Sequence, residues 1–267
     1  MQLIKMIILM FPSILFSNDN IMPKHSILIC YGRLEPETIK GYHYVILESQ
    51  HYNIYEINKI KSQNEKVVAY ISLGEINAHS KYFELLKENT FGKNEIWNSY
   101  YLNLKSDYTI EKIMEMVKNT LDLGYDGLFF DNIDNFTSFG PQSQQKEDLL
   151  KLLKTIDNDY SDHVFIQNAG IQIISETAQY VDAIVVESVA SNYTFDDKNY
   201  KLRDLTVFEN AISELEKVRK KYKIPLILIE YADNMELYNA ILKRINDSKF
   251  DCFIGNIDLQ TMPKFSN

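Results

Sequence analysis

The sequence predicts one (β/α)8 (TIM) barrel, and three observations support this fold class. The chain has 267 residues, close to the roughly 250 that this fold typically takes. Eight short and continuous apolar runs alternate along it with helical or polar stretches. Glycine and proline are scarce, at 9 and 6, so long linkers between separate domains are not expected. Continuous apolar runs indicate strands covered on both faces, and hence a parallel sheet.

The predicted elements follow one another in a regular order. The strands are 26–32, 44–48, 67–75, the apolar body of 124–134, 163–168, 183–188, 226–231 and 252–256. Apolar residues at helical spacing predict helices at 36–41, 52–61, 108–123, 146–156, 171–180, 207–222 and 235–245. Two polar inserts, 77–107 and 192–205, interrupt the alternation. An open doubly wound sheet is the alternative, but no Gly-rich phosphate loop follows the first strand.

The first 17 residues resemble an export signal. Lys5 supplies a positive charge, residues 6–16 are almost wholly apolar, and residues 17–20 are polar. The apolar run is too short for an ordinary membrane span, so we expect cleavage near Ser17, with an uncleaved anchor as the alternative. The barrel domain is then 26–262, and the expected location is periplasmic or secreted. No membrane contact beyond the signal is expected, and we expect a monomer.

Charge and composition exclude several classes of protein. The formal net charge is −9, whereas a nucleic-acid binder needs a basic surface to neutralise phosphates. The same charge argues against docking on anionic lipid, and it permits a cationic or neutral ligand. Hydrophobic residues make up 45% of the chain, enough for a sizeable core, so a disordered protein is excluded.

The two cysteines are predicted to stay unpaired. Cys30 follows the first strand run at its carboxyl end, and Cys252 opens the eighth at its amino end. A disulfide needs Cα atoms within about 7 Å, so neighbouring strands whose cysteines lie at opposite ends cannot form one. We expect two free and buried thiols.

Polar side chains gather where the predicted strands end. In a barrel all carboxyl ends meet around one mouth, where barrel enzymes place their sites. The alternative is that each is an ordinary turn residue in a solvated loop. A ring of carboxylates and amides favours a functional mouth. Its members are Glu48, Ser72, Glu75, Asp131, Asn132, Asp134, Gln167, Asn168, Glu187, Glu230, Asn256 and Asp258.

The residue types at this mouth favour carboxylate chemistry. No histidine lies at a strand end and no G-x-S-x-G motif is present, which argues against a zinc site and a serine hydrolase. Two carboxylates acting as acid and nucleophile or base are typical of glycoside hydrolysis, and aromatic rings suit sugar faces. We expect no cofactor and no metal, because a divalent ion on Asp131 and Asp134 would lack a ligand loop. Trp97, the only tryptophan, is equally compatible with the core and with a sugar platform.

Layer geometry selects one pair of carboxylates. Inward side chains of alternate strands share a layer in these barrels, and side chains alternate along a strand with period two. Asp131 ends the fourth strand and Glu187 ends the sixth, so both can point into one layer. Strands two apart lie roughly 9–10 Å from each other. Inward-leaning side chains can close this to the roughly 5–5.5 Å of a retaining pair.

Four strand motifs stand out in the sequence: residues 69–75 (AYISLGE), 124–134 (GYDGLFFDNID), 167–170 (QNAG) and 186–188 (VES). They resemble strands three to six of glycoside hydrolase family 114, the endo-α-1,4-polygalactosaminidase family. The strand-four signature of that family is G-F-D-G, three hydrophobic residues, D-N, one hydrophobic residue and D, which residues 124–134 resemble.

The resemblance implies a glycosidase that cleaves α-1,4-linked galactosamine-containing polysaccharide internally, by a retaining mechanism. Asp131 would be the nucleophile and Glu187 the general acid/base. The residues implied to shape the sugar site are Tyr70, Glu75, Asn132, Asp134, Asn168 and Glu230. An acidic mouth suits a cationic, partly deacetylated polymer. The alternative is a non-catalytic barrel that binds polysaccharide of the cell envelope or matrix.

Overall fold

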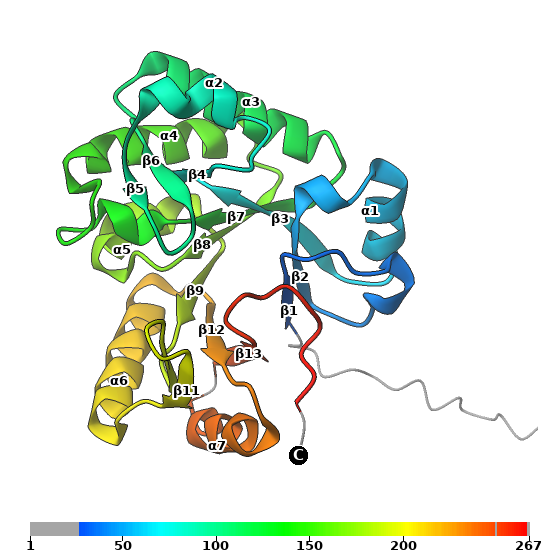
Figure 1. Cartoon of the computed structure of the whole chain (residues 1–267), viewed down its shortest axis with the longest axis vertical. Helices are drawn as coiled ribbons and strands as arrows, with labels where there is room; N and C mark the ends of the chain where they lie inside the picture. The colour runs from blue at the N-terminus through cyan, green and yellow to red at the C-terminus, as the bar shows by residue number, and fades with distance from the viewer. Residues whose placement is uncertain (1–26, 249, 266–267) are drawn as a thin grey trace, which may run out of the picture.

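The computed structural model describes residues 27–248 and 250–265 and shows a nearly closed barrel of eight parallel strands (Figure 1). The strand order around the sheet is β1-β2-β3-β7-β8-β9-β12-β13. Strands β1 and β13 pack against each other at the seam, where the Tyr31 N–H donates to the Leu259 carbonyl oxygen at 2.7 Å. The strands are β1 Ile27–Cys30, β2 Tyr44–Glu48, β3 Lys66–Ser72, β7 Gly127–Asp131, β8 Val164–Asn168, β9 Ala183–Glu187, β12 Leu226–Tyr231 and β13 Asp251–Gly255. The predicted (β/α)8 fold is confirmed.

Helices cover the outside of this barrel, as predicted, with two differences. The predicted helix 36–41 is only a 3-10 turn, Pro36–Thr38, because Pro36 and Gly41 leave room for little more. The predicted helix 171–180 is divided into Ile171–Ile173 and Ala178–Tyr180, both 3-10, and α5 between them. From residue 256 to 265 the described chain contains no helix. The helices are α1 Ile54–Lys61, α3 Asp107–Leu121, α4 Lys146–Asp159, α5 Ile174–Thr177, α6 Leu205–Tyr222 and α7 Met235–Ile245.

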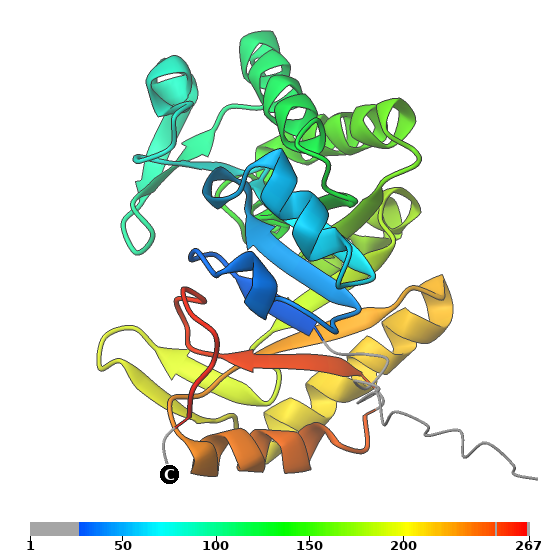
Figure 2. The same ribbon diagram turned by 90° about the vertical axis from the view of Figure 1, so that its right-hand side faces the viewer.

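Both inserts fold into small antiparallel sheets. The first contains α2 (Phe83–Leu86) and a three-stranded sheet of β4 (Glu75–Asn77), β5 (Thr90–Asn94) and β6 (Ser99–Leu102). The second is the hairpin β10–β11 (Ser191–Thr194 and Asn199–Leu202). Figure 2 shows both on the side toward which the barrel strands point. The predicted third strand was too long: β3 ends at Ser72, and Glu75 already belongs to β4.

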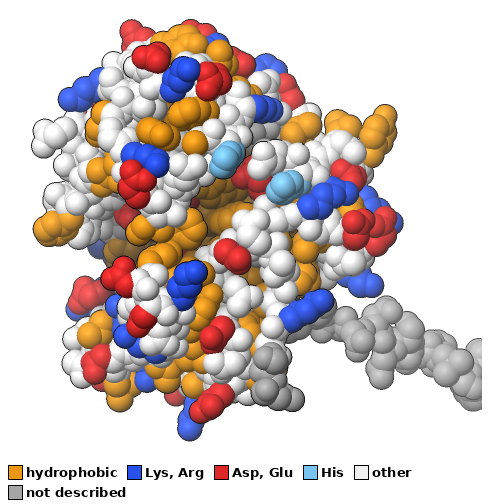
Figure 3. Space-filling model, viewed as in Figure 1, with side chains coloured by type: hydrophobic (Ala, Val, Ile, Leu, Met, Phe, Trp, Pro, Cys, Tyr) orange, Lys and Arg blue, Asp and Glu red, His pale blue; other side chains and the backbone are white. Residues whose placement is uncertain are grey.

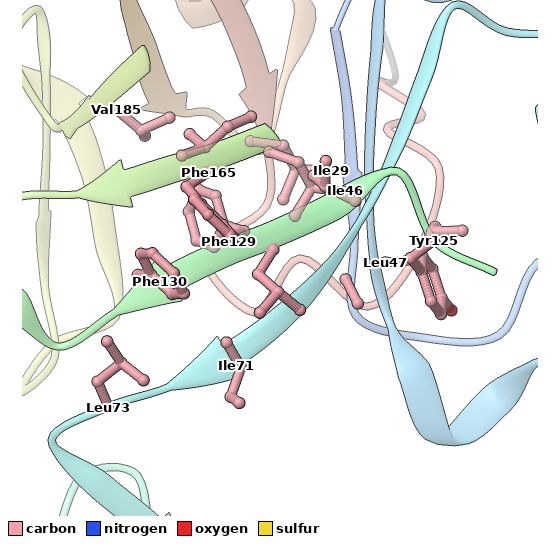
Figure 4. Close-up of a cluster of buried hydrophobic side chains, with 14 of the residues drawn as sticks. Ile29, Ile46, Leu47, Ile71, Leu73, Tyr125, Phe129, Phe130, Phe165 and Val185 are labelled. Atoms are coloured by element: carbon pink, nitrogen blue, oxygen red, sulfur yellow. The ribbon is translucent and has the colours of Figure 1, made fainter. Parts of the chain in front are cut away.

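The buried apolar residues form two clusters. The larger one fills the barrel interior, where Phe129 lies, and continues on the outer face of the strands under helices α1, α3 and α4; Figure 4 shows part of it, including Phe129 and Phe165. Along β12, Ile227, Ile229 and Tyr231 belong to this larger cluster. Leu226 and Leu228 belong to the second cluster, which packs outward against α6 and α7. Strands covered on both faces need apolar residues at every position, which explains the continuous runs in the sequence.

The cysteine prediction is confirmed for pairing and, in one case, for burial. Both thiols are free; Cys30 is buried, whereas Cys252 is partly exposed. Burial nevertheless raises the pKa of both thiols. The proposed export signal, 1–17, lies outside the described residues. Within 27–248 and 250–265, no helix combines the length and the apolar character that a membrane crossing requires.

Candidate active site

Three polar residues end neighbouring strands of the barrel and point into its mouth. Asp131 is the last residue of β7, Asn168 of β8 and Glu187 of β9. Seen from this end, the molecule has a hollowed face (Figure 3). In each case the next residue adopts the left-handed conformation, which turns the chain sharply out of the strand. These residues are Asn132, Ala169 and Ser188, with φ of 62°, 58° and 56°.

One amide group holds the two carboxylates together. Asn168 Nδ2 donates to Asp131 Oδ1 at 2.9 Å and to Glu187 Oε1 at 2.6 Å. The two oxygen atoms therefore lie no further apart than the sum of these distances, about 5.5 Å. The amide nitrogen must face them, because an amide oxygen would meet two acceptors. The structure thus brings together Asp131 and Glu187, which layer geometry had paired.

A tyrosine hydroxyl donates a hydrogen bond to the other oxygen of each carboxylate. Tyr70, on β3, donates to Asp131 Oδ2 at 2.8 Å. Tyr231, at the end of β12, donates to Glu187 Oε2. The parallel register aligns Tyr70 with Phe129, two residues before Asp131, so the two strands present these side chains on one face. Hydrogen bonds to all four oxygens fix both carboxylates before any substrate arrives.

The surroundings of Glu187 favour its protonated form. Glu187 is partly exposed at the mouth, but burial of its carboxyl group raises its pKa. The hydrogen bond from Tyr231 opposes this effect, and the negative charge of Asp131 adds to it. A carboxyl group held protonated beside an ionised one can give a proton to a leaving group.

Two further carboxyl groups lie around this pair. Asp134 is exposed, yet protein atoms around its carboxyl group raise its pKa by burial, and the charge of Asp131 adds to this. Burial likewise raises the pKa of Glu48 on β2. Tyr31 follows β1 and packs its ring against Tyr70, with centroids 4.7 Å apart. Four carboxyl groups, those of Glu48, Asp131, Asp134 and Glu187, are therefore crowded at this mouth.

Glu75 and Asn132 accept hydrogen bonds from neighbouring side chains. Glu75 is buried and accepts hydrogen bonds from Ser99 Oγ and from Asn135 Nδ2, the latter at 2.9 Å. Asn132 accepts a hydrogen bond from Ser72 Oγ at 2.5 Å. The structure places Glu75 inside the first insert and Asn132 at the turn that leaves β7.

Glu230 lies on the outer face of β12, away from the mouth. Its fully buried carboxylate accepts from the backbone N–H groups of Val189, Ala190 and Ser191 at 2.6–3.0 Å, and from Ser191 Oγ at 2.5 Å. It therefore holds the chain that leaves β9. Side chains alternate with period two along β12, so Tyr231 points into the barrel and Glu230 points out of it. Glu230 therefore does not reach a sugar at the mouth, contrary to what the family resemblance implied.

Tyr231, Tyr31 and Glu48 were not among the predicted site residues, although Glu48 belonged to the ring of strand-end groups. The sequence pattern that could have identified Tyr231 is its spacing of two and four residues from Ile229 and Ile227, which places all three side chains on one face of β12.

Asp126, by contrast, is at the opposite end of the barrel, where it accepts from the Val67 N–H at 2.8 Å and pairs with Lys61 at 2.9 Å. It serves as a structural link between strands.

Comparison with solved structures supports the fold. The glycoside hydrolase domain of PelA from Pseudomonas aeruginosa superimposes with a TM-score of 0.78 at 20% identity, over 89% of this chain and 96% of that one. Aspergillus fumigatus Ega3, solved in complex with galactosamine, superimposes with a TM-score of 0.71 at 16% identity, over 92% and 96%. A comparison with curated proteins gives no match.

Family assignment comes from the sequence itself. A model of glycoside hydrolase family GH114 matches residues 26–266, which is nearly the whole chain and includes all three strand-end residues of the site. This agrees with the motif resemblance and with a barrel whose mouth carries two closely held carboxylates. The chain therefore belongs to glycoside hydrolase family GH114.

Proposed function

We propose that this protein hydrolyses α-1,4-linked galactosamine-containing polysaccharide by a retaining mechanism, with Asp131 and Glu187 as the catalytic pair. The observation that carries the proposal is the shared hydrogen bonding of both carboxylates to Asn168, which keeps the two bonded oxygens at most about 5.5 Å apart. Retaining glycosidases hold their two carboxyl groups about 5–5.5 Å apart, and inverting ones about 6.5–9.5 Å.

The surroundings of the two groups suggest their roles. The raised pKa of Glu187 suits the general acid that protonates the leaving oxygen. Asp131, oriented by Tyr70 and Asn168, would attack the anomeric carbon and form a covalent glycosyl-enzyme. Glu187, then ionised, would accept a proton from the water that releases the sugar from Asp131 and so regain its starting state.

The charge of the mouth favours an amino sugar. Asp134 and Glu48 add carboxyl groups near the catalytic pair, and the whole chain has a formal net charge of −9. A galactosamine unit with a free amine is cationic at neutral pH, so Coulomb attraction would draw such a polymer to this mouth. The bound galactosamine in Ega3 agrees with this substrate class. Tyr70, Asn132, Asp134 and Asn168 would then border the sugar, with cleavage at internal bonds outside the cytoplasm.

A reducing-end assay on a panel of amino-sugar polymers tests the proposal. The protein should shorten partly deacetylated α-1,4-galactosaminan, and Asp131→Asn and Glu187→Gln should each lower the rate at least about a thousandfold. Glu209→Gln, an exposed carboxylate on α6, is the matched control and should keep full activity. Full activity in either site variant, with unchanged folding by circular dichroism, would refute the assignment. Binding of the polymer without new reducing ends would favour the non-catalytic alternative.

A further inference from the structure

Two hairpin turns meet at the rim of the mouth. One turn, 95–98, joins β5 to β6 in the first insert, and the other, 195–198, joins β10 to β11 in the second. The inserts leave the barrel just after β3 and just after β9. Between those strands in the sheet lie β7 and β8, which carry Asp131 and Asn168. The hairpins therefore flank the carboxylate pair and converge on the same side of the molecule (Figure 2).

The contact between the hairpins is made by aromatic rings. Trp97 and Phe195 lie perpendicular to each other with centroids 5.6 Å apart. Phe195 also meets Tyr193 perpendicularly at 5.0 Å, and Tyr193 meets Tyr200 at 4.6 Å. Figure 3 shows hydrophobic side chains beside the hollow, where the upper and lower parts of the face approach each other. A row of rings thus runs from one insert along the other.

These rings are not part of the core. Trp97 is 48% exposed and Phe195 is 43% exposed, and neither belongs to the two buried clusters. Of the two roles that the sequence allowed for Trp97, its exposure excludes a place in the core. Close to half of each side chain's surface is therefore accessible to a ligand.

Hydrogen bonds stabilise the two turns that carry the rings. Asn77 Nδ2 donates to the Trp97 carbonyl oxygen at 2.9 Å, and Thr194 Oγ1 donates to Asp197 in the other turn. Each turn closes with a left-handed residue, Asn98 at φ 50° and Lys198 at φ 53°. Turns that are ordered before binding lose little conformational entropy when a ligand arrives.

We infer that Trp97 and Phe195 form a second sugar-binding site, which holds a unit of the polysaccharide beyond those bound at the carboxylate pair. Sugar rings present apolar C–H faces that pack on aromatic rings. Asp196, exposed beside Phe195, adds a carboxylate that suits an ammonium group. The inference rests on the proposed function and deepens it, because it makes affinity depend on the length of the chain.

Trp97 is the only tryptophan in the chain, so the intrinsic tryptophan emission reports on this site alone. The full-length Glu187→Gln variant is titrated with galactosamine oligomers of increasing length. Emission should change saturably with chains long enough to reach Trp97, and it should stay constant with the disaccharide. Long chains that bind to saturation by calorimetry without any change in emission would overturn the inference.

Steady-state kinetics on otherwise native protein provide the second readout. Trp97→Ala and Phe195→Ala should each raise the ratio of KM for the long polymer to KM for a short oligomer by roughly three- to tenfold, as expected for the loss of one stacking contact. Trp97→Phe, which keeps a ring, should lose less. Tyr55→Ala on α1 removes an aromatic side chain that is 83% exposed and serves as the control, with an unchanged ratio.

The outcomes separate this inference from the proposed function. Equal rises of KM for short and long substrates, with a lower melting temperature, would mean that the ring contact only ties the hairpins together, and would overturn the inference. Hydrolysis without any dependence on chain length would overturn it while leaving the proposed function intact. Failure of galactosamine chains of every length to bind or to be cleaved would overturn the proposed substrate and this site together.

Discussion

Tyr231→Phe should change both the rate and the pH dependence of hydrolysis. The substitution keeps the buried ring and removes only the hydroxyl that donates to Glu187. That hydrogen bond favours the ionised form of Glu187 and thus lowers its pKa against the stronger effect of burial. Its loss should therefore raise the pKa of Glu187 further.

The expected magnitude follows from the proposed role of Glu187 as the general acid. A hydrogen bond to a charged group contributes about 1.5–3 kcal/mol, and Glu187 acquires only part of its negative charge as it gives up its proton in the transition state. If about half of this stabilisation is realised there, kcat/KM should fall roughly three- to tenfold near the optimum. Activity declines at high pH as Glu187 ionises, so the descending limb should move to higher pH in the variant.

The assay is a kcat/KM profile across pH for wild type, Tyr231→Phe and Tyr70→Phe. Tyr70→Phe removes the corresponding 2.8 Å hydrogen bond to Asp131 and should lower the rate while leaving the descending limb in place. If the high-pH decline of kcat/KM in Tyr231→Phe stays at the same pH or moves to lower pH, the decline does not report the ionisation of Glu187, and its assignment as the general acid is refuted.

Two further predictions concern stability. Folding raises the pKa of Glu187, so the folded protein favours the protonated carboxyl group. The stability that Glu187 contributes is therefore fully present below its ordinary pKa near 4.5, and it is lost as the pH rises through the raised pKa. Glu187→Gln should accordingly melt higher than wild type at pH 7 and lose this advantage near pH 4; an advantage that grows on acidification would contradict the sign. Glu230→Gln should lower the unfolding free energy by about 2–4 kcal/mol, since it sets an NH2 group against buried backbone donors, and chemical denaturation with no change in midpoint would contradict this role.

The strands and the pairing of Asp131 with Glu187 were predictable because they follow local rules. Continuous apolar runs mark strands buried on both faces, and period-two alternation places Phe129 with Asp131 and Val185 with Glu187. The same runs hide which face of a strand is inside. Every residue of β12 is buried, so hydrophobicity alone gave no reason to choose Tyr231 over Glu230 as the residue that faces the mouth.

The contacts that complete the site depend on distant parts of the chain. The bridge from Asn168 to both carboxylates requires three strand ends at one height, and the Trp97–Phe195 contact requires two hairpins of particular length and twist. Neither requirement leaves a short-range pattern in the sequence. The resemblance in family motifs identified Asn168 as a site residue, but only the geometry shows that it sets the gap between Asp131 and Glu187.

The turns that follow the three strand ends were also beyond prediction, because none of their left-handed residues is glycine. Asn132, Ala169 and Ser188 all adopt positive φ, and a non-glycine residue in this region costs about 1 kcal/mol or more. Hydrogen bonds from neighbouring strands hold two of these turns: the Ala169 N–H donates to Val185 O at 2.9 Å and the Ser188 N–H to Ile229 O at 2.8 Å. Each turn ends its strand directly after a site residue, so the side chains of Asp131, Asn168 and Glu187 stay at the mouth while the backbone leaves it. These three strained turns thus keep the carboxyl groups of Asp131 and Glu187 within hydrogen-bonding distance of the Asn168 amide.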